Sequence, residues 1–436
     1  MLDDASQQDH GPRTGELVRL GALALLQLAI GAACCARGWW LAGGVFCILA
    51  AAVIGISGLV GISLARFALG ARPRTSGEET EVPVPIPRKV GFLEAVFGAH
   101  GMIGSRAATP ERADDTCDVA VESAIDAQVG SMLRRTSAVE ERFSELLTPA
   151  QRTQIRNARA AERLLTYEWL RAMPDWVPVS VTSDDGVTVV GRTLVAHPES
   201  SRWAVLVHGY AGRWHEMILY ARHWAMQGYN LLLVEQRAHG RSGGRWRGLG
   251  YLERRDLVAW VSWLVGQDGP AGPRASVVLH GHSMGAASVL LASAEADMPA
   301  QVCAAVGDSA FVSGWTACAH LLGDGGLPEH PTLELMRAAL LAQPDGYDIA
   351  KAHVLDALRR PGLPVLIIHG AQDSLVPVAT AQALYDVAAR PKALLVVPGA
   401  GHCQACLADP VAYYGEVFSF VDRSLRDGDP SSSNAC

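Results

Sequence analysis

The pattern of apolar and polar positions divides the chain into an apolar amino-terminal part and a longer part of short, alternating runs. Near the amino end, Leu20–Ala36 is almost entirely apolar, and Gly38–Ala65 contains no charged residue. A membrane-spanning helix needs about 20 consecutive apolar residues. The second run has that length and the first approaches it. The pattern therefore predicts a transmembrane helical hairpin over residues 20–65, with helices at about 20–36 and 40–64.

Basic residues around the two runs predict how such a hairpin is oriented. The connecting loop holds only Arg37, whereas several basic residues follow the second run, namely Arg66, Arg72, Arg74, Arg88 and Lys89. Because basic residues accumulate on the cytoplasmic side of membrane proteins, we expect both ends of this multi-pass protein in the cytoplasm. A single anchor in the second run, or a buried hairpin in a soluble protein, are the alternatives.

Composition also predicts the boundaries of the other regions. Residues 1–19 form a tail before the hairpin. Residues 66–112 include a stretch rich in Pro, Glu and Ser, which cannot bury a core and predicts an extended linker. Residues 113–175 are mostly helix-like and predict a helical domain that precedes the main one. Residues 427–436 are expected to form a disordered tail.

From residue 176 to residue 426, short apolar runs alternate with helix-like segments. An opening β-hairpin is expected at Val177–Thr182 and Val187–Ala196. Alternating strands and helices are typical of an α/β fold, in which a mostly parallel sheet is covered by helices on both faces. The segment at about 311–360 interrupts the alternation, and its length predicts a short lid.

The run Gly281-His282-Ser283-Met284-Gly285 lies between an apolar stretch, Ser276–His280, and a helix-like stretch, Ala286–Ala296. A serine at the apex of such a strand–turn–helix has strained backbone angles and an exposed hydroxyl. Its hydroxyl is a poor nucleophile until a base removes the proton. Ser283 is therefore a candidate nucleophile that needs two partners.

Two downstream residues are the candidate partners of the serine. Asp373 follows the apolar run Pro364–His369, and His402 follows the run Ala393–Pro398. Histidine can act as the base near neutral pH, and a carboxylate can orient it and stabilise its charged form. The order serine, aspartate, histidine is that of nucleophile-elbow hydrolases. Asp308, which ends the preceding strand, is the competing candidate for the acid.

Two further motifs complete a resemblance to a known superfamily. His208-Gly209-Tyr210 follows the apolar run Trp203–Val207, and Gln236–Ser242 follows Asn230–Glu235. With the elbow and its partners, these segments resemble the α/β-hydrolase superfamily over about residues 177–425. Among its members the chain is most similar to bacterial membrane-anchored hydrolases of the Bem46-like and serine-aminopeptidase-like groups. The resemblance implies the α/β-hydrolase fold and a serine mechanism, but not a substrate.

Backbone donors are expected to bind the oxyanion of such a reaction. One is the N–H of Met284, which follows the nucleophile, and the other is the N–H of Tyr210. His282, Phe311 and Trp315 could line the substrate pocket. His208, His282 and His239 are more simply explained as structural residues that brace their turns.

Cys403 and Cys406 form a C-x-x-C directly after the candidate base. A redox motif normally opens a helix in a thioredoxin-like unit, and zinc needs about four ligands. Both are therefore expected to be packing thiols, with a labile disulfide as the alternative. We expect no metal and no cofactor.

The sequence thus predicts a membrane-anchored serine hydrolase that cleaves a small-molecule ester, thioester or amide through an acyl-serine. An esterase is favoured over a serine peptidase, because no acidic cluster that would bind a substrate amine is evident. The net charge of −7 argues against a nucleic-acid partner. The alternative from another class is a catalytically idle scaffold that acts as a membrane-bound binding or regulatory module.

Overall fold

The computed structural model describes residues 59, 61–66, 69–70, 145–173, 176–267, 269–324 and 328–427. The predicted tail 1–19 and nearly all of the predicted hairpin lie outside the described residues. So do most of the linker, residues 113–144 of the predicted helical domain and the carboxyl-terminal tail beyond Asp427. In the part of the chain that is described, no helix has the length and apolar character required to cross a membrane.

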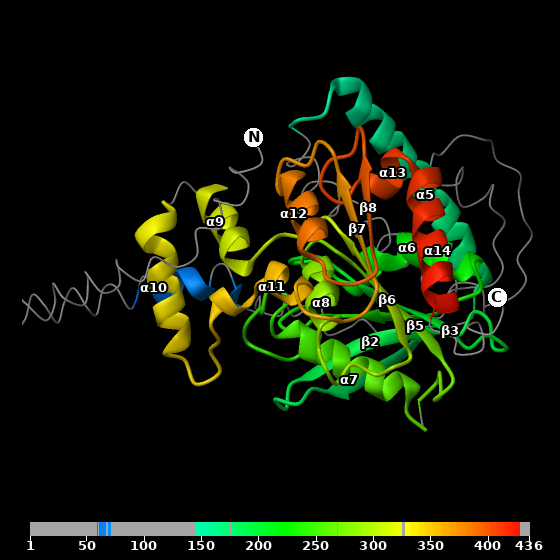
Figure 1. Cartoon of the computed structure of the whole chain (residues 1–436), viewed down its shortest axis with the longest axis horizontal. Coiled ribbons are helices and arrows are strands. Elements are labelled where there is room, and N and C mark those ends of the chain that lie inside the picture. The colour runs from blue at the N-terminus through cyan, green and yellow to red at the C-terminus, as the bar shows by residue number, and fades with distance from the viewer. Residues whose placement is uncertain are drawn as a thin grey trace, which may run out of the picture.

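The domain is built on an eight-stranded sheet in the order β1-β2-β4-β3-β5-β6-β7-β8 (Figure 1). Only β2 runs against its neighbours, and every pairing from β4 to β8 is parallel. The predicted, mostly parallel sheet is confirmed. The strands are β1 (Val177–Thr182), β2 (Thr188–Leu194), β3 (Arg202–Val207), β4 (Asn230–Val234), β5 (Ser276–His282), β6 (Val302–Asp308), β7 (Val365–Gly370) and β8 (Lys392–Val397).

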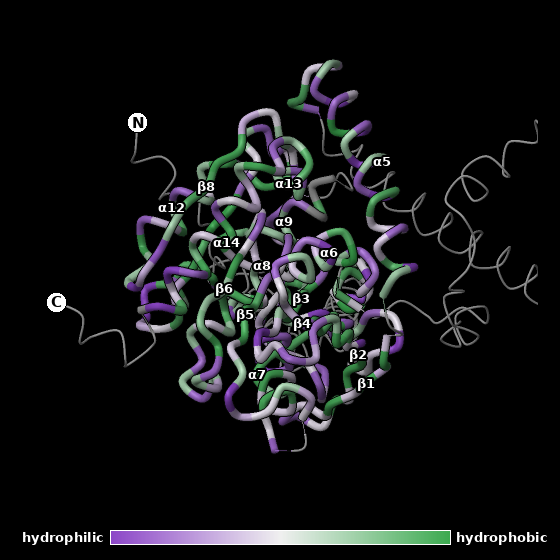
Figure 2. Tube along the Cα trace, turned by 90° about the vertical axis from the view of Figure 1, so that its right-hand side faces the viewer, coloured by the Kyte–Doolittle hydropathy of each residue, from purple (hydrophilic) through white to green (hydrophobic). Residues whose placement is uncertain are grey.

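Burial on both faces explains why the central strands are continuous apolar runs. Every residue of β4 and of β7 is buried, as expected for parallel strands covered on two sides. Alternate residues point to opposite faces: along β3, Val205 and Val207 join one hydrophobic cluster, while Ala204 and Leu206 join the other. Figure 2 shows that these inner strands are mainly hydrophobic and that hydrophilic residues are frequent along the outer helix α5.

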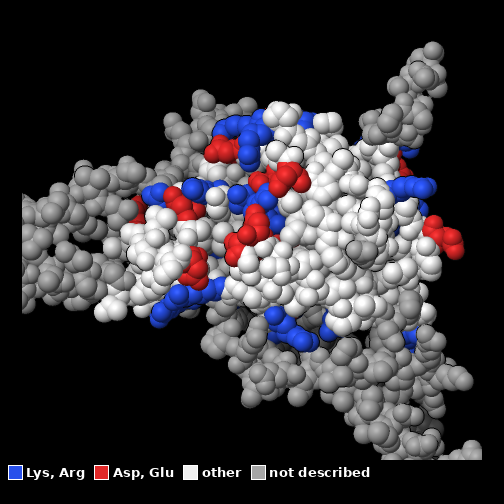
Figure 3. Space-filling view, turned by 90° about the horizontal axis from the view of Figure 1, so that it is seen from below, with Lys and Arg blue, Asp and Glu red and all other residues white. Residues whose placement is uncertain are grey.

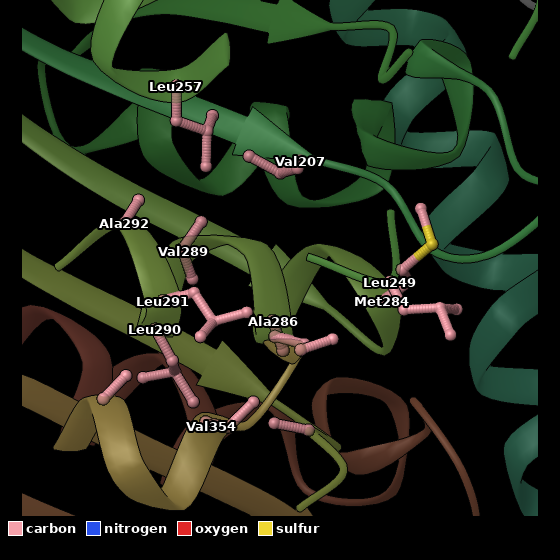
Figure 4. Packing of buried hydrophobic residues seen from close by; sticks show 14 of the residues in the cluster. Val207, Leu249, Leu257, Met284, Ala286, Val289, Leu290, Leu291, Ala292 and Val354 are labelled. Carbon is pink, nitrogen blue, oxygen red and sulfur yellow. The ribbon is translucent and has the colours of Figure 1, made fainter. Parts of the chain in front are cut away.

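Helices cover both faces of the sheet. On one face lie α7 (Glu253–Val265), α8 (Met284–Ala292), α11 (Val354–Leu358) and α12 (Ala379–Val387). Figure 4 shows Val289 and Leu290 of α8 packed near Val207, Leu257 and Val354. On the other face lie α5 (Pro149–Ala172), α6 (Ile218–Met226), α13 (Ala405–Ala408) and α14 (Pro410–Asp427).

Helix α5 is the described part of the predicted helical region 113–175. Thr148 caps it, because its hydroxyl accepts a hydrogen bond from the backbone N–H of Gln151, and Pro149 is the first helical residue. The helix packs against α6 and α13. Its Glu162 carboxylate accepts hydrogen bonds from Arg222 of α6 at 2.8–3.0 Å. The described part of this region therefore packs on the hydrolase sheet.

The segment between β6 and β7 leaves the domain as a small helical projection, at the site of the predicted lid (Figure 1). It contains α9 (Gly314–Asp324), α10 (Glu329–Leu341), the short 3-10 helix η3 (Ile349–Lys351) and α11. Arg337 of α10 and Asp348 form two hydrogen bonds of 2.6 Å, which tie α10 to the return segment.

A short amino-terminal piece packs against this projection, shown in blue beside α10 in Figure 1. We call residues 61–66, with 69 and 70, the N-terminal segment. Two residues of this segment, Ala65 and Leu69, are completely buried. Residues 61–65 end the predicted hairpin, and 69–70 lie in the predicted linker. The structure instead places these residues against protein, so the packed part of the chain extends across that boundary.

Charged side chains on the outer surface form mixed groups. On the face seen in Figure 3, acidic and basic residues lie side by side, with no extended area of one sign. Arg255 illustrates this arrangement, because it pairs with Asp184, Glu295 and Asp297 at 2.7–3.0 Å.

Candidate active site

Ser283 lies at a sharp turn between β5 and α8. Its backbone angles, φ 53° and ψ −120°, fall in a region that residues other than glycine rarely adopt. A Cβ on Gly281 would lie 2.2 Å from the carbonyl oxygen of Gly285, and a Cβ on Gly285 would lie 2.2 Å from that of Val207. No side chain fits at these distances, which explains both glycines of the turn.

The structure brings Ser283, His402 and Asp373 into one hydrogen-bonded line. The His402 Nε2 atom lies 2.9 Å from the Ser283 Oγ atom, and its Nδ1 atom lies 2.8 Å from the Asp373 Oδ2 atom. The three residues follow β5, β8 and β7, which run parallel and so end at the same edge of the sheet. This is the geometry in which a base can deprotonate a serine while a carboxylate orients the base.

Asp373 is held as a buried carboxylate. Its Oδ1 atom accepts hydrogen bonds from the backbone N–H groups of Leu375 and Val376 at 2.9 and 2.8 Å. A second histidine, His369, places its Nε2 atom 3.2 Å from Oδ2. Burial alone would raise the pKa of Asp373, but charge and hydrogen bonds from His402 and His369 outweigh it and hold the pKa well below its usual range.

Asp308, the competing acid, has a different set of partners. Its carboxylate accepts hydrogen bonds from the Ser309 hydroxyl at 2.9 Å and the Tyr413 hydroxyl at 3.1 Å. Its backbone carbonyl accepts one from the N–H of Ser283 at 2.8 Å, and the Ser309 hydroxyl accepts one from the N–H of Cys403 at 3.1 Å. Asp308 therefore supports the backbone on both sides of the site, whereas Asp373 contacts the imidazole.

The loop after β3 passes directly beside the serine. A Cβ on Gly209 would lie 3.3 Å from the Ser283 Cβ atom, so the peptide that leads to Tyr210 lies close to the nucleophile. Met284 is the first residue of α8, where backbone N–H groups have no partner within the helix. The loop that leads to Tyr210 and the first residue of α8 thus both lie beside the serine, and the oxyanion role of their N–H groups remains a proposal.

Two histidines connect the loop after β3 to the turn after β4 by hydrogen bonds. The His208 Nε2 atom accepts a hydrogen bond from the backbone N–H of Gln236 at 3.0 Å. The His239 Nε2 atom accepts one from the N–H of Ala211 at 3.1 Å, and its Nδ1 atom lies 2.8 Å from the carbonyl of Arg237. His239 therefore supports the loop after β3 as well as its own turn.

Comparison with known protein families gives a match over several strands of the sheet and the turn at Ser283. A protein-family model described as serine aminopeptidase, S33 (Hydrolase_4), matches residues 198–324. The match includes Ser283 and ends before Asp373 and His402. The chain has the α/β-hydrolase fold, and its residues 198–324 are similar to this serine hydrolase family.

Individual relatives of this α/β-hydrolase cover about half of the chain. It is 28% identical over 244 residues to YqkD, an uncharacterized protein of Bacillus subtilis (strain 168), covering 56% of this chain and 78% of YqkD. It is 28% identical over 259 residues to the monoacylglycerol lipase of Mycolicibacterium smegmatis, covering 50% of this chain and 86% of that lipase. Among solved structures, the esterase Pf2001 of Pyrococcus furiosus is similar with a TM-score of 0.46 at 25% identity, covering 58% of this chain and 91% of the esterase.

The expected pocket residues of the hydrolase are all largely buried. Phe311 and Trp315 are 7% and 2% exposed. The indole N–H of Trp315 donates to a carboxylate oxygen of Glu329 at 3.1 Å, so this tryptophan joins α9 to the start of α10. Burial, and then the charge of His402, lowers the pKa of His282 to about 3, so that this side chain is neutral.

Glu216 is a carboxyl group near the site that sequence patterns do not reveal. It belongs to the 3-10 helix η2 (Trp214–Met217), and its Oε2 atom lies 3.8 Å from the His282 Nε2 atom. Burial raises its pKa to about 7. Near neutral pH a large fraction of this carboxyl group is therefore protonated.

His369 is a second residue whose place in the site sequence reasoning missed. It was expected only as the end of a strand, yet it contacts the carboxylate of Asp373. The signal was available, because His369-Gly370 comes only a few residues before Asp373. Arg247, which contacts Tyr210, has no comparable signal because the two residues lie in separate loops.

The two cysteines after the candidate base are buried and not joined by a disulfide. Burial raises the pKa of Cys406 to about 12, so it is a protonated thiol. Cys403 has a positive φ of 53°. Among the described residues, no group of three or more His, Cys, Asp or Glu side chains is arranged to hold a metal ion.

Proposed function

We propose that the protein is a serine hydrolase that cleaves an ester through an acyl-serine intermediate. The observation that carries this proposal is the line of two hydrogen bonds, 2.9 and 2.8 Å long, from Ser283 through His402 to Asp373. No metal or cofactor is needed in this mechanism, because the nucleophile, base and oxyanion donors are all provided by the chain.

The reaction follows from the geometry. His402 Nε2 accepts the proton of Ser283 as the Oγ atom attacks the carbonyl carbon of the substrate, and Asp373 stabilises the resulting imidazolium. The backbone N–H groups of Met284 and Tyr210 bind the negative oxygen of the tetrahedral intermediate. Its collapse breaks the bond to the leaving group, which takes the proton from His402. Water then attacks the acyl-serine in the same way and releases the acid.

An ester is favoured over a peptide for two reasons. A relative that is 28% identical is named a monoacylglycerol lipase. In addition, the carboxyl group found beside the elbow, Glu216, has a pKa raised to about 7. A carboxyl group that is largely protonated binds a substrate ammonium group poorly. Because the matching family model is named for a serine aminopeptidase, peptidase activity is the alternative.

We also propose that the apolar residues before Gly61 anchor the enzyme in a membrane and that the catalytic domain faces the cytoplasm; residues 61–65 pack against the protein instead. The support is the pair of apolar runs and the basic residues that follow the second run. A green fluorescent protein fused at the carboxyl end should fluoresce, and an alkaline phosphatase fused there should be inactive. The reverse result would place the domain outside and would favour a single anchor.

Labelling with a fluorophosphonate probe tests the proposed function. The full-length protein is expected to react at Ser283 and to hydrolyse p-nitrophenyl esters faster than aminoacyl p-nitroanilides. A peptide map identifies the modified residue, and heat-denatured protein is the control. Absence of both labelling and ester hydrolysis in folded protein would support the idle scaffold instead. Preference for the anilides would support the peptidase.

A further inference from the structure

The N-terminal segment forms an unusually close contact with helix α10 of the lid. A Cβ on Gly61 would lie 2.3 Å from the carbonyl oxygen of Leu335 and 2.9 Å from the Ala339 Cβ atom. The absence of a side chain at Gly61 therefore allows the segment and α10 to approach backbone to backbone, as small residues do between packed helices. Ala65, one turn further along, is completely buried.

The same segment is bonded to the loop that follows β4. The backbone N–H of Arg247 donates to the carbonyl of Leu69 at 2.7 Å, and Gly70 pairs with Trp246 in an antiparallel bridge. Leu69 is completely buried, so this bond is shielded from water. The segment thus contacts the lid with one end and the loop at Arg247 with the other.

Arg247 connects this contact to the loop beside the serine. Its side chain is 2% exposed, and its guanidinium carbon lies 5.0 Å from the centre of the Tyr210 ring. One guanidinium nitrogen lies 3.4 Å from the Tyr210 hydroxyl. Its backbone carbonyl accepts a hydrogen bond of 2.6 Å from Tyr347, which lies between α10 and η3. Arg247 thus contacts the N-terminal segment, the lid and the Tyr210 loop.

We propose that Arg247 is a positioning residue through which the N-terminal segment and the lid hold Tyr210 in place for oxyanion binding. This inference rests on the proposed function, because Tyr210 affects the rate only if its N–H binds the developing oxyanion. Because the predicted second membrane run leads into this segment, the segment would connect the proposed anchor to the catalytic loop.

The first test separates the segment from α10 in the full-length protein. Gly61→Leu places a side chain against the backbone of Leu335, while Ser63→Leu adds the same side chain at an exposed position of the same segment. With a soluble short-chain ester, Gly61→Leu should lower kcat about tenfold, because small displacements of catalytic groups are costly. KM should change less than about twofold, since binding of the substrate before reaction is not affected. Ser63→Leu should match the wild type.

The second test acts on the connecting residue. Arg247→Ala should also lower kcat with little change in KM, and Arg247→Lys should retain part of the rate because its cation can still lie over the Tyr210 ring. The losses in the double variant Gly61→Leu/Arg247→Ala should be smaller than the product of the single losses, because both changes act on one connection.

Hydrogen exchange provides a measurement that does not depend on activity. At a temperature well below the Tm of every variant, amides of residues 209–212 should exchange faster in Gly61→Leu and in Arg247→Ala, but not in Ser63→Leu. Faster exchange at 61–66 with wild-type kcat and unchanged exchange at 209–212 would overturn the inference. If the wild type fails to hydrolyse any ester or to react with the probe, the proposed function fails, and the exchange pattern still decides whether the segment holds the loop.

Discussion

Ser283→Ala is expected to lower kcat by about 10⁴-fold or more while leaving the fold intact. Alanine removes the hydroxyl that the His402 Nε2 atom contacts at 2.9 Å, and no acyl-enzyme can then form. The change should remove fluorophosphonate labelling as well. The measurement is steady-state hydrolysis of a p-nitrophenyl ester, with Tm determined on the same preparation.

A matched control is Ser262→Ala, at an exposed position of α7, which should have wild-type activity. A Ser283→Ala protein, purified free of other hydrolases, that keeps activity within about tenfold of the wild type would show that Ser283 is not the nucleophile.

Asp373→Asn is expected to lower kcat by about 10⁴-fold, as loss of the orienting carboxylate does in serine hydrolases. The carboxylate bonds to His402 at 2.8 Å and is held by two backbone N–H groups and by His369. An asparagine cannot stabilise the imidazolium that forms when Ser283 attacks. The loss of activity should appear mainly as a lower kcat, with a smaller change in KM.

Asp308→Asn is the matched comparison, because it makes the same chemical change at the competing position. Its carboxylate contacts Ser309 and Tyr413 rather than the imidazole, so the expected effect is a lower Tm and a loss in kcat of less than about tenfold. If Asp308→Asn costs more activity than Asp373→Asn, the assignment of the acid is reversed.

Local sequence patterns were sufficient to predict that Ser283, Asp373 and His402 lie together, and their catalytic roles stay predictions. Each lies directly after an apolar strand, and parallel strands end at one edge of a sheet, so a serine turn after β5 and loops after β7 and β8 must be close together. Strong burial also makes the central strands recognisable, because covering both faces leaves few polar positions. These features depend on short segments whose chemistry can be read without knowledge of distant contacts.

Contacts between distant segments could not be predicted in this way. Trp315 was expected near the pocket, but its place is decided by packing within the lid and by its bond to Glu329. His239 was expected to brace its own turn, and its additional bond to Ala211 depends on how two loops meet. A polar side chain shows that a partner is needed, but the pattern of the sequence does not say which segment provides it.

The burial of Ala65 and Leu69 has a consequence for how the enzyme can be prepared. A chain shortened to begin after residue 70 would lack the apolar amino-terminal runs and be a natural choice for expression. It would remove two completely buried side chains and the carbonyl that accepts the N–H of Arg247. The apolar surface exposed in this way would promote self-association, and poor turnover in such a sample would say little about the native enzyme. The full-length protein keeps this part of the core in place.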